Sequence, residues 1–138
     1  MRDIPRGARN AMMNMLLMVG LGSGAGGILR FLLARAVQTH VPGSFPWGTA
    51  AVNLAGSLMI GALYGLFERG ELMNAEARLF LTVGLCGGFT TFSTLMNESF
   101  LLLREGNFVS FFLYALLSFA GGLLAVGLGY LAVTATRS

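Results

Sequence analysis

The chain has 138 residues, of which 55% are hydrophobic and only 11% are charged, and its formal net charge is +3. Because soluble domains carry about a quarter charged residues, this composition excludes a chain whose surface mostly faces water. The charges leave four uncharged runs, at 11–29, 46–67, 79–97 and 107–136, each near the roughly 20 residues that cross a hydrocarbon core. We therefore expect a single-domain, all-α integral membrane protein with four spanning helices, near 11–37, 46–67, 76–103 and 107–135.

Side chains that commonly build chemical sites are scarce. The one cysteine, Cys86, excludes an internal disulfide and a cysteine-rich metal site, and the one histidine, His40, is expected in a short loop. The nine basic residues are arginines near the helix ends, which suits membrane flanks better than a nucleic-acid surface. We therefore expect neither an enzyme nor a nucleic-acid-binding protein.

The first predicted helix, 11–37, is rich in glycine. Its glycines match G-x-G-x-x-G, but that dinucleotide fingerprint requires a preceding strand. The spacings Gly20/Gly24 and Gly22/Gly26 instead allow close helix packing in lipid. A cleaved signal peptide is the alternative for this segment, but the apolar stretch exceeds the usual 7–15 residues and includes Arg30.

The second and fourth predicted helices each carry a stripe of small or polar residues. The stripe on 46–67 consists of Asn53, Ser57, Gly61 and Gly65, and the stripe on 107–135 consists of Ser110, Tyr114, Ser118, Gly121 and Gly122. Spacings of about four residues place each set on one helix face. We expect the two stripes to converge in the bundle.

The third predicted helix, 76–103, contains GLCGGFTTFST (84–94), which is turn chemistry within an apolar run. Non-helical backbone survives in a bilayer only inside protein or against water. Gly87 and Gly88 lower the cost of leaving helical geometry, and Thr90, Thr91 and Ser93 can cap a restarted half-helix. We therefore expect a break at the centre of this helix, with carbonyls that can hold a small cation. A packed glycine kink is the alternative.

The polar residues of the predicted spans favour an anion as the ligand. The hydrogen-bond donors, the aromatic ring and the cation that we assign to its route are Asn53, Ser93, Thr94, Tyr114, Ser118, Phe92 and Arg30. A cation pathway would show buried carboxylates, and Glu98, the one acidic candidate, lies where it can reach the membrane surface. Alternatives remain open: Arg30 can extend to an interface, and Asn53, Tyr114 and Ser118 can bond helices together.

These residues resemble those of the small fluoride channels called Fluc or CrcB. The similarity runs from Val19 to Tyr130 and is carried by GGFTTFST (87–94), NLAGS (53–57), GILRF (27–31), and Tyr114 with Ser118. The resemblance implies a four-helix subunit that forms an antiparallel, dual-topology homodimer with two fluoride pores and a structural sodium ion at its centre.

The resemblance also implies roles for individual residues. Backbone oxygens of Gly87 and Thr90 would hold the sodium ion. The fluoride path would be lined by Asn53, Phe92, Ser93, Thr94, Tyr114 and Ser118, with Arg30 at a vestibule and Glu98 at an acidic position near the pore. The expected function is passive fluoride export across a bacterial inner membrane, which relieves fluoride toxicity.

The chain departs from the family pattern at two points. Leu95 stands where the family usually has a second phenylalanine, which puts the second ring of a paired-phenylalanine arrangement in doubt. Arginines also gather on the N-terminal side of the predicted bundle, which favours one orientation by the positive-inside rule. Two other functions remain open: a small dual-topology multidrug transporter, which would need a buried glutamate in the first helix, and a non-transporting assembly subunit.

Overall fold

The computed structural model describes residues 4–71 and 74–136, and this part of the chain is helical and contains no strand. The elements are α1 (Arg6–His40), α2 (Trp47–Glu68), α3 (Ala75–Leu79), the π-helix η1 (Phe80–Cys86), α4 (Gly87–Phe89), α5 (Phe92–Arg104) and α6 (Phe108–Thr134). Four stretches are long and apolar enough to cross a membrane: α1, α2, Ala75–Arg104 and α6. This confirms the prediction of an all-helical protein with four candidate spans.

The first helix is longer than the uncharged run that predicted it. It begins at Arg6, directly after Pro5, and ends at His40, whereas the sequence indicated 11–37. Pro42 disfavours helical geometry at the preceding Val41, so the helix can include His40, whose Nδ1 lies 2.7 Å from the Ala36 carbonyl oxygen. The prediction that His40 lies in a loop was therefore wrong.

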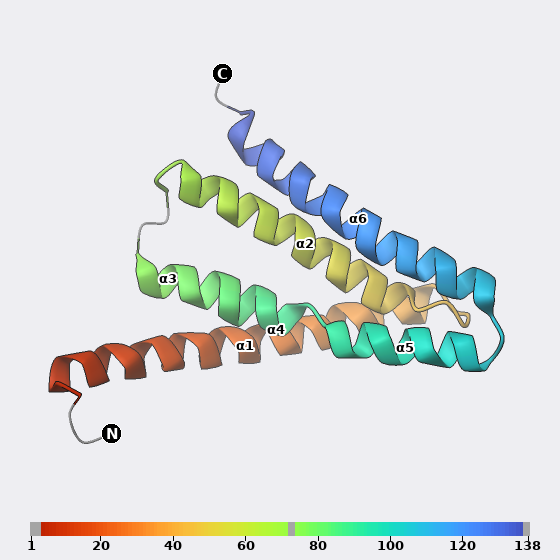
Figure 1. Ribbon diagram of the computed structural model, residues 1–138, viewed down its shortest axis with the longest axis horizontal. Helices are drawn as coiled ribbons and strands as arrows, with labels where there is room; N and C mark the ends of the chain where they lie inside the picture. Colours follow the sequence, from red (N-terminus) through yellow and green to blue (C-terminus); the bar gives the residue numbers. More distant parts are fainter. Residues whose placement is uncertain (1–3, 72–73, 137–138) are drawn as a thin grey trace.

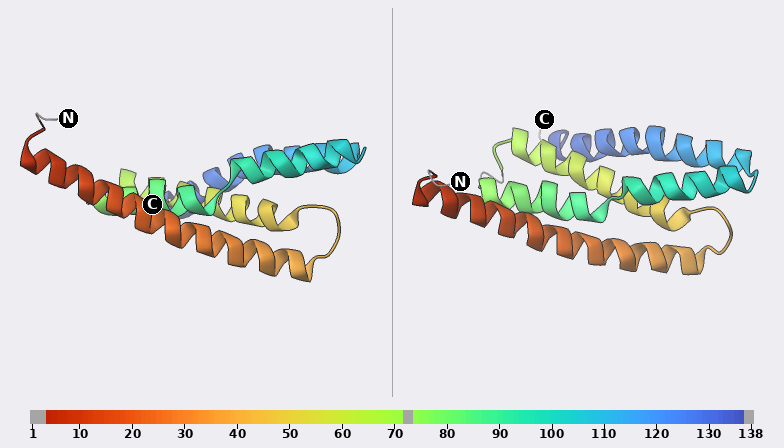
Figure 2. Two further views of the ribbon diagram at one scale, coloured as in Figure 1. Left: turned by 90° about the horizontal axis from the view of Figure 1, so that it is seen from below. Right: turned by 60° about the horizontal axis from the view of Figure 1, so that its bottom comes forward.

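Two helix pairs organise the molecule (Figures 1 and 2). The helices α2 and α6 lie side by side, and α1 lies against η1 and α4. A β-carbon added at Gly61 would overlap the carbonyl oxygen of Val126, and one at Gly129 would overlap that of Leu58. The absence of side chains at these glycines therefore allows α2 and α6 to approach closely.

The glycine-rich face of α1 packs through only some of its glycines. Gly22 and Gly26 are buried against η1 and α4, where added β-carbons would meet backbone atoms. Gly20 and Gly24 have no neighbour within 4 Å of such a position in the described chain. The packing interpretation thus applies to one of the two predicted pairs.

The outer surface of the bundle is strongly apolar. Large hydrophobic side chains such as Phe119 (75% exposed), Phe112 (67%) and Leu124 (68%) point away from the rest of the chain, while Tyr114 and Val52 are fully buried. Such a surface requires an apolar solvent. With four helices of spanning length, the chain is therefore a multi-pass membrane protein.

Candidate functional site

The helical backbone is interrupted between α4 and α5. Thr90 (φ −84°, ψ 157°) and Thr91 (φ −147°, ψ 118°) are extended, whereas Gly87 is helical (φ −63°, ψ −38°). The two threonines, and not the glycines, therefore leave helical geometry. Gly88 serves packing instead, since a β-carbon there would meet the carbonyl oxygen of Ser23 at 2.5 Å.

Hydroxyl groups cap both ends of the interruption. Thr90 Oγ1 donates to the Cys86 carbonyl oxygen over 3.0 Å. Thr91 Oγ1 accepts from the backbone N–H of Thr94 over 3.3 Å, which makes Thr91 the N-cap of α5. The capping role that was predicted for Thr90, Thr91 and Ser93 thus falls on Thr90 and Thr91.

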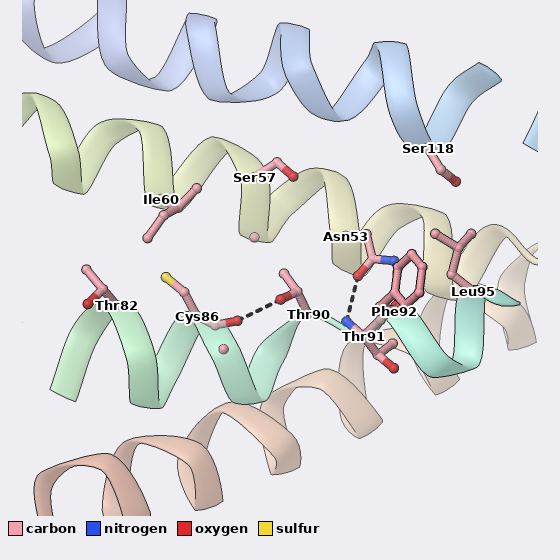
Figure 3. A pocket seen from close by; sticks show the side chains of 12 residues that line it. Asn53, Ser57, Ile60, Thr82, Cys86, Thr90, Thr91, Phe92, Leu95 and Ser118 are labelled. Carbon is pink, nitrogen blue, oxygen red and sulfur yellow. Dashed lines mark hydrogen bonds between the residues drawn. The ribbon is translucent and has the colours of Figure 1, made fainter. Parts of the chain in front are cut away.

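Asn53 of α2 holds the extended backbone in place (Figure 3). Its Nδ2 donates to the Thr91 carbonyl oxygen over 3.1 Å, and the Thr91 N–H donates to its Oδ1 over 2.9 Å. One amide therefore satisfies both backbone groups of a residue that has left the helix. Asn53 keeps a second N–H for another acceptor.

The interruption leaves carbonyl groups without their helical donors, among them those of Gly87 and Thr90. In an uninterrupted helix the Thr91 N–H would bond to the Gly87 oxygen and the Thr94 N–H to the Thr90 oxygen. Here those N–H groups donate to Asn53 Oδ1 and Thr91 Oγ1. The oxygens of Gly87 and Thr90 are thus available to other partners.

A cavity of about 420 Å³ lies beside the interruption, between α2, the third span and α6 (Figure 3). Five of the predicted site residues line it: Asn53, Gly87, Thr90, Phe92 and Ser118. Ser118 Oγ is buried and has no hydrogen-bond partner in the described chain. Since a buried hydroxyl normally finds a partner, this one is free to donate to a ligand in the cavity.

A second cavity, of about 380 Å³, contains two more of the predicted residues, Arg30 and Thr94. Arg35, Thr49 and Thr91 also line it, and Thr91 lines the first cavity as well. Neither cavity is lined by a carboxylate. The first cavity therefore presents the Ser118 hydroxyl to an anion, and the second presents two guanidinium groups, although the Glu98 carboxylate lies one hydrogen bond away, behind Thr49.

Glu98 and Tyr114 line neither cavity and bond to each other. Tyr114, which is fully buried, donates to Glu98 Oε2 over 3.0 Å, and Thr49 donates to Glu98 Oε1 over 2.7 Å. The sequence placed Glu98 where it could reach the membrane surface, but two hydroxyls hold it between α2 and α6. These hydrogen bonds offset the cost of removing a carboxylate from water. Tyr114 consequently has no free proton for an anion in this arrangement.

Ser93 is the predicted residue with the least support from the geometry. It is exposed on α5 and lines neither cavity. In contrast, the sequence analysis missed Thr49, which bonds to Glu98 and lines the second cavity. Because Thr49 lies four residues before Asn53, it extends the polar stripe of α2 by one turn, and that spacing could have identified it.

Comparisons with known proteins identify a family for the chain. The family model "CrcB-like protein, Camphor Resistance (CrcB)" matches residues 17–130. The chain is 49% identical over 117 residues to a fluoride-specific ion channel FluC of Phocaeicola vulgatus, covering 85% of this chain and 96% of the relative. It is 44% identical over 119 residues to the protein of the same name from Aquifex aeolicus, covering 86% and 96%.

Proposed function

The chain belongs to the CrcB family, whose relatives named above are fluoride-specific ion channels, and we propose a route by which it conducts fluoride. The protein is a fluoride channel and not an enzyme. It lets the anion leave the cell down its own gradient and thereby relieves fluoride toxicity. The membrane in this proposal is the inner membrane of a bacterium.

The observation that carries the route is the unpartnered hydroxyl of Ser118. It faces the same cavity as the Asn53 amide and the Phe92 ring (Figure 3). A fluoride ion that leaves water needs donors in place of its hydration shell, and those donors must also release it. Ser118 Oγ, the spare N–H of Asn53 and the positive edge of Phe92 supply such contacts without a fixed charge.

Arg30 and Thr94 serve the entrance in this proposal. They line the second cavity with Arg35, and Thr91 adjoins both cavities. The guanidinium groups raise the local concentration of anions, and the Thr94 hydroxyl, which accepts from Thr91 and keeps its own proton, passes the ion to the donors around Asn53. The exposed Ser93 contributes only where a second copy of the chain covers α5.

Tyr114 and Glu98 control one part of the route. Tyr114 donates to Glu98 in this arrangement, so its hydroxyl reaches an anion only after it turns away from the carboxylate. Glu98 would then retain the Thr49 hydroxyl. This exchange keeps the carboxylate hydrogen-bonded while the phenol serves fluoride.

A structural sodium ion fits the two carbonyl oxygens at the interruption. Unwound backbone carbonyls are the usual ligands of sodium in broken membrane helices, and those of Gly87 and Thr90 have lost their helical donors to Asn53 and Thr91. Groups of histidine, cysteine and carboxylate side chains that could hold a metal are absent from the described residues. Bound there, the cation would supply positive charge that stabilises the open backbone.

An antiparallel dimer completes both sites. The Gly87 and Thr90 oxygens of one chain give the ion two ligands, and a twofold-related copy would add the same two and bring four oxygens to it. Phe92 lies beside the polar interruption yet is 74% exposed. A second copy of the chain would cover Phe92 and would enclose the anion between that copy and α6. The dimer would insert in both orientations, although the arginine distribution favours one of them.

Anion efflux from proteoliposomes tests the proposed route. Vesicles loaded with either fluoride or chloride should release fluoride alone when the protein is present. Equal release of both anions would contradict the selective route. Release of neither would favour the assembly-subunit alternative, and a multidrug transporter is disfavoured because α1 contains no acidic residue.

A further inference from the structure

The first turns of α1 lie outside the packed bundle. Every residue from Ile4 to Asn14 is exposed, and Met15 is the first residue of α1 that is partly buried. In Figures 1 and 2 this end of the helix, drawn in red, reaches beyond the start of α3. The match to the CrcB family also begins only at residue 17. This segment therefore needs an explanation other than packing within the chain or the part of the chain that matches the family.

The length of α1 places the segment at the membrane surface. The helix has 35 residues, which extend about 52 Å at 1.5 Å per residue, whereas the hydrocarbon core is ~30 Å thick. The helix is therefore about 22 Å longer than the core, and its N-terminal turns extend from the acyl chains into the headgroup layer.

Along this end of α1, charged residues are followed by apolar residues, in the same order as the headgroup and the acyl chains of a lipid. Arg6 and Arg9 come first, and neither makes a hydrogen bond or ion pair within residues 4–71 and 74–136. Below them lies an apolar belt whose side chains are each more than half exposed: Met12, Met13, Leu16 and Leu17. In a bilayer, this order places the arginines at the level of the phosphate groups and the apolar side chains at the level of the acyl chains.

Arginines near the same end of the bundle already have partners. Arg69 donates to the Val133 carbonyl oxygen over 2.7 Å and pairs with Glu71 at 3.3 Å, and Arg78 lies 4.7 Å from the centre of the Phe67 ring. The first turn of α1, in contrast, contains no acidic residue. Arg6 and Arg9 stand one turn apart, so their charges act on the same neighbourhood.

We propose that the N-terminal turns of α1 bind the phosphate groups of anionic phospholipids through Arg6 and Arg9. Guanidinium groups bind phosphate with two parallel hydrogen bonds, and the apolar belt contacts the acyl chains of the same lipids. An anionic lipid is selected over a zwitterionic one because it lacks a cation that would offset its phosphate. Cations also oppose the dipole at the start of a helix, and anionic headgroups relieve that conflict.

Lipid retention tests the proposal on the full-length protein. The channel is reconstituted in phosphatidylcholine vesicles with a minor fraction of phosphatidylglycerol and extracted in mild detergent, and the retained lipids are measured by mass spectrometry. The wild type should retain more phosphatidylglycerol than the bulk ratio. The Arg6→Gln/Arg9→Gln variant should lose that enrichment, by about fivefold for each arginine.

Two comparisons make the outcome specific to this segment. Arg104→Gln, which removes an exposed arginine at the end of α5, should leave the enrichment unchanged. High salt in the extraction buffer should reduce the wild-type enrichment, because exposed charges are screened. Unchanged enrichment in Arg6→Gln/Arg9→Gln, an equal loss in Arg104→Gln, or insensitivity to salt would each overturn the proposal.

Discussion

Two helix pairs pack closely at glycines, but only one of them contains irregular backbone. The first pair is α2 with α6, and the second is α1 with the third span. Both pairs bring backbones together at glycines, Gly61 and Gly129 in the first and Gly22 and Gly88 in the second. The helices α2 and α6 are regular from end to end, whereas the third span combines a π-helix, a three-residue α4 and two extended threonines. Close packing alone therefore does not produce a site.

The difference lies in the partners of the backbone groups. In a regular helix the N–H and C=O groups bond to each other, so α2 and α6 contribute to the site only through side chains such as Asn53 and Ser118. In the third span the N–H groups of Thr91 and Thr94 bond to side chains, which frees the carbonyls of Gly87 and Thr90 among others. Irregular backbone at membrane depth is tolerated only where protein or a cavity satisfies it, and for that reason we propose that ions bind here.

The largest effect is expected from a side chain placed between α2 and α6. Gly129→Leu would push a side chain into the backbone of Leu58, which neither helix can relieve by a rotamer change. We expect almost no folded protein by size-exclusion chromatography and no fluoride efflux. Gly127→Leu is the matched control, since a β-carbon there has no neighbour within 4 Å. Equal yields of the two variants would show that close packing of this pair is dispensable.

The next effect concerns the clamp on the extended backbone. Asn53→Ala leaves the N–H and C=O of Thr91 unpaired, at about 1–3 kcal/mol for each buried group. The melting temperature in detergent and the fluoride efflux should both fall, with efflux down at least about tenfold.

Asn53→Asp sharpens the same test. It keeps one acceptor for the Thr91 N–H but replaces the donor with a carboxylate in the path of the anion. Compared with Asn53→Ala, this variant should lose more fluoride efflux and less stability. Undiminished efflux in this variant would remove Asn53 from the route.

Ser118→Ala should separate conduction from stability. Its hydroxyl has no partner in the described chain, so the melting temperature should stay within error of the wild type. Efflux should fall at least about tenfold, because a hydrogen bond to a charged group is worth about 1.5–3 kcal/mol. Ser99→Ala is the control, since that hydroxyl bonds only to the Leu95 carbonyl of its own helix. A loss of stability without a loss of efflux would give Ser118 a packing role.

The smallest effect on efflux is expected at the link between α5 and α6. Tyr114→Phe removes one of the two hydroxyls bonded to Glu98 and leaves Thr49 in place. We expect a loss of about 1.5–3 kcal/mol in stability, because the partner is a carboxylate, and a smaller fall in efflux than in Ser118→Ala. A fall as large as that of Asn53→Asp would instead make Tyr114 an obligatory donor to fluoride.

The sequence predicts the four spans well because lipid imposes the same apolar length on each of them. It also restricts the interruption to 84–94, where hydroxyls and glycines replace apolar residues. It assigns the extended geometry to the wrong residue type, because glycine permits either conformation and the choice depends on a neighbour. Ser23 of α1 requires Gly88 to lack a side chain, and that contact is visible only in the fold.

The polar partners were harder to predict than the polar residues. Asn53 and Tyr114 stand out in apolar helices, but their hydrogen bonds to Thr91 and Glu98 span 38 and 16 positions. Helix periodicity gives the face of one helix and not its rotation against the next. The long start of α1 was missed for another reason. An uncharged run shows which residues can lie in the hydrocarbon core, whereas a helix can continue beyond the core.

The partner of the Thr91 N–H, seen in an experimental map of the dimer with sodium present, tests the central claim most directly. We predict that this N–H faces Asn53 Oδ1 and that a cation density lies within bonding distance of the Gly87 and Thr90 oxygens. An uninterrupted helix in which the Thr91 N–H bonds to the Gly87 oxygen, with no cation beside it, would contradict the account.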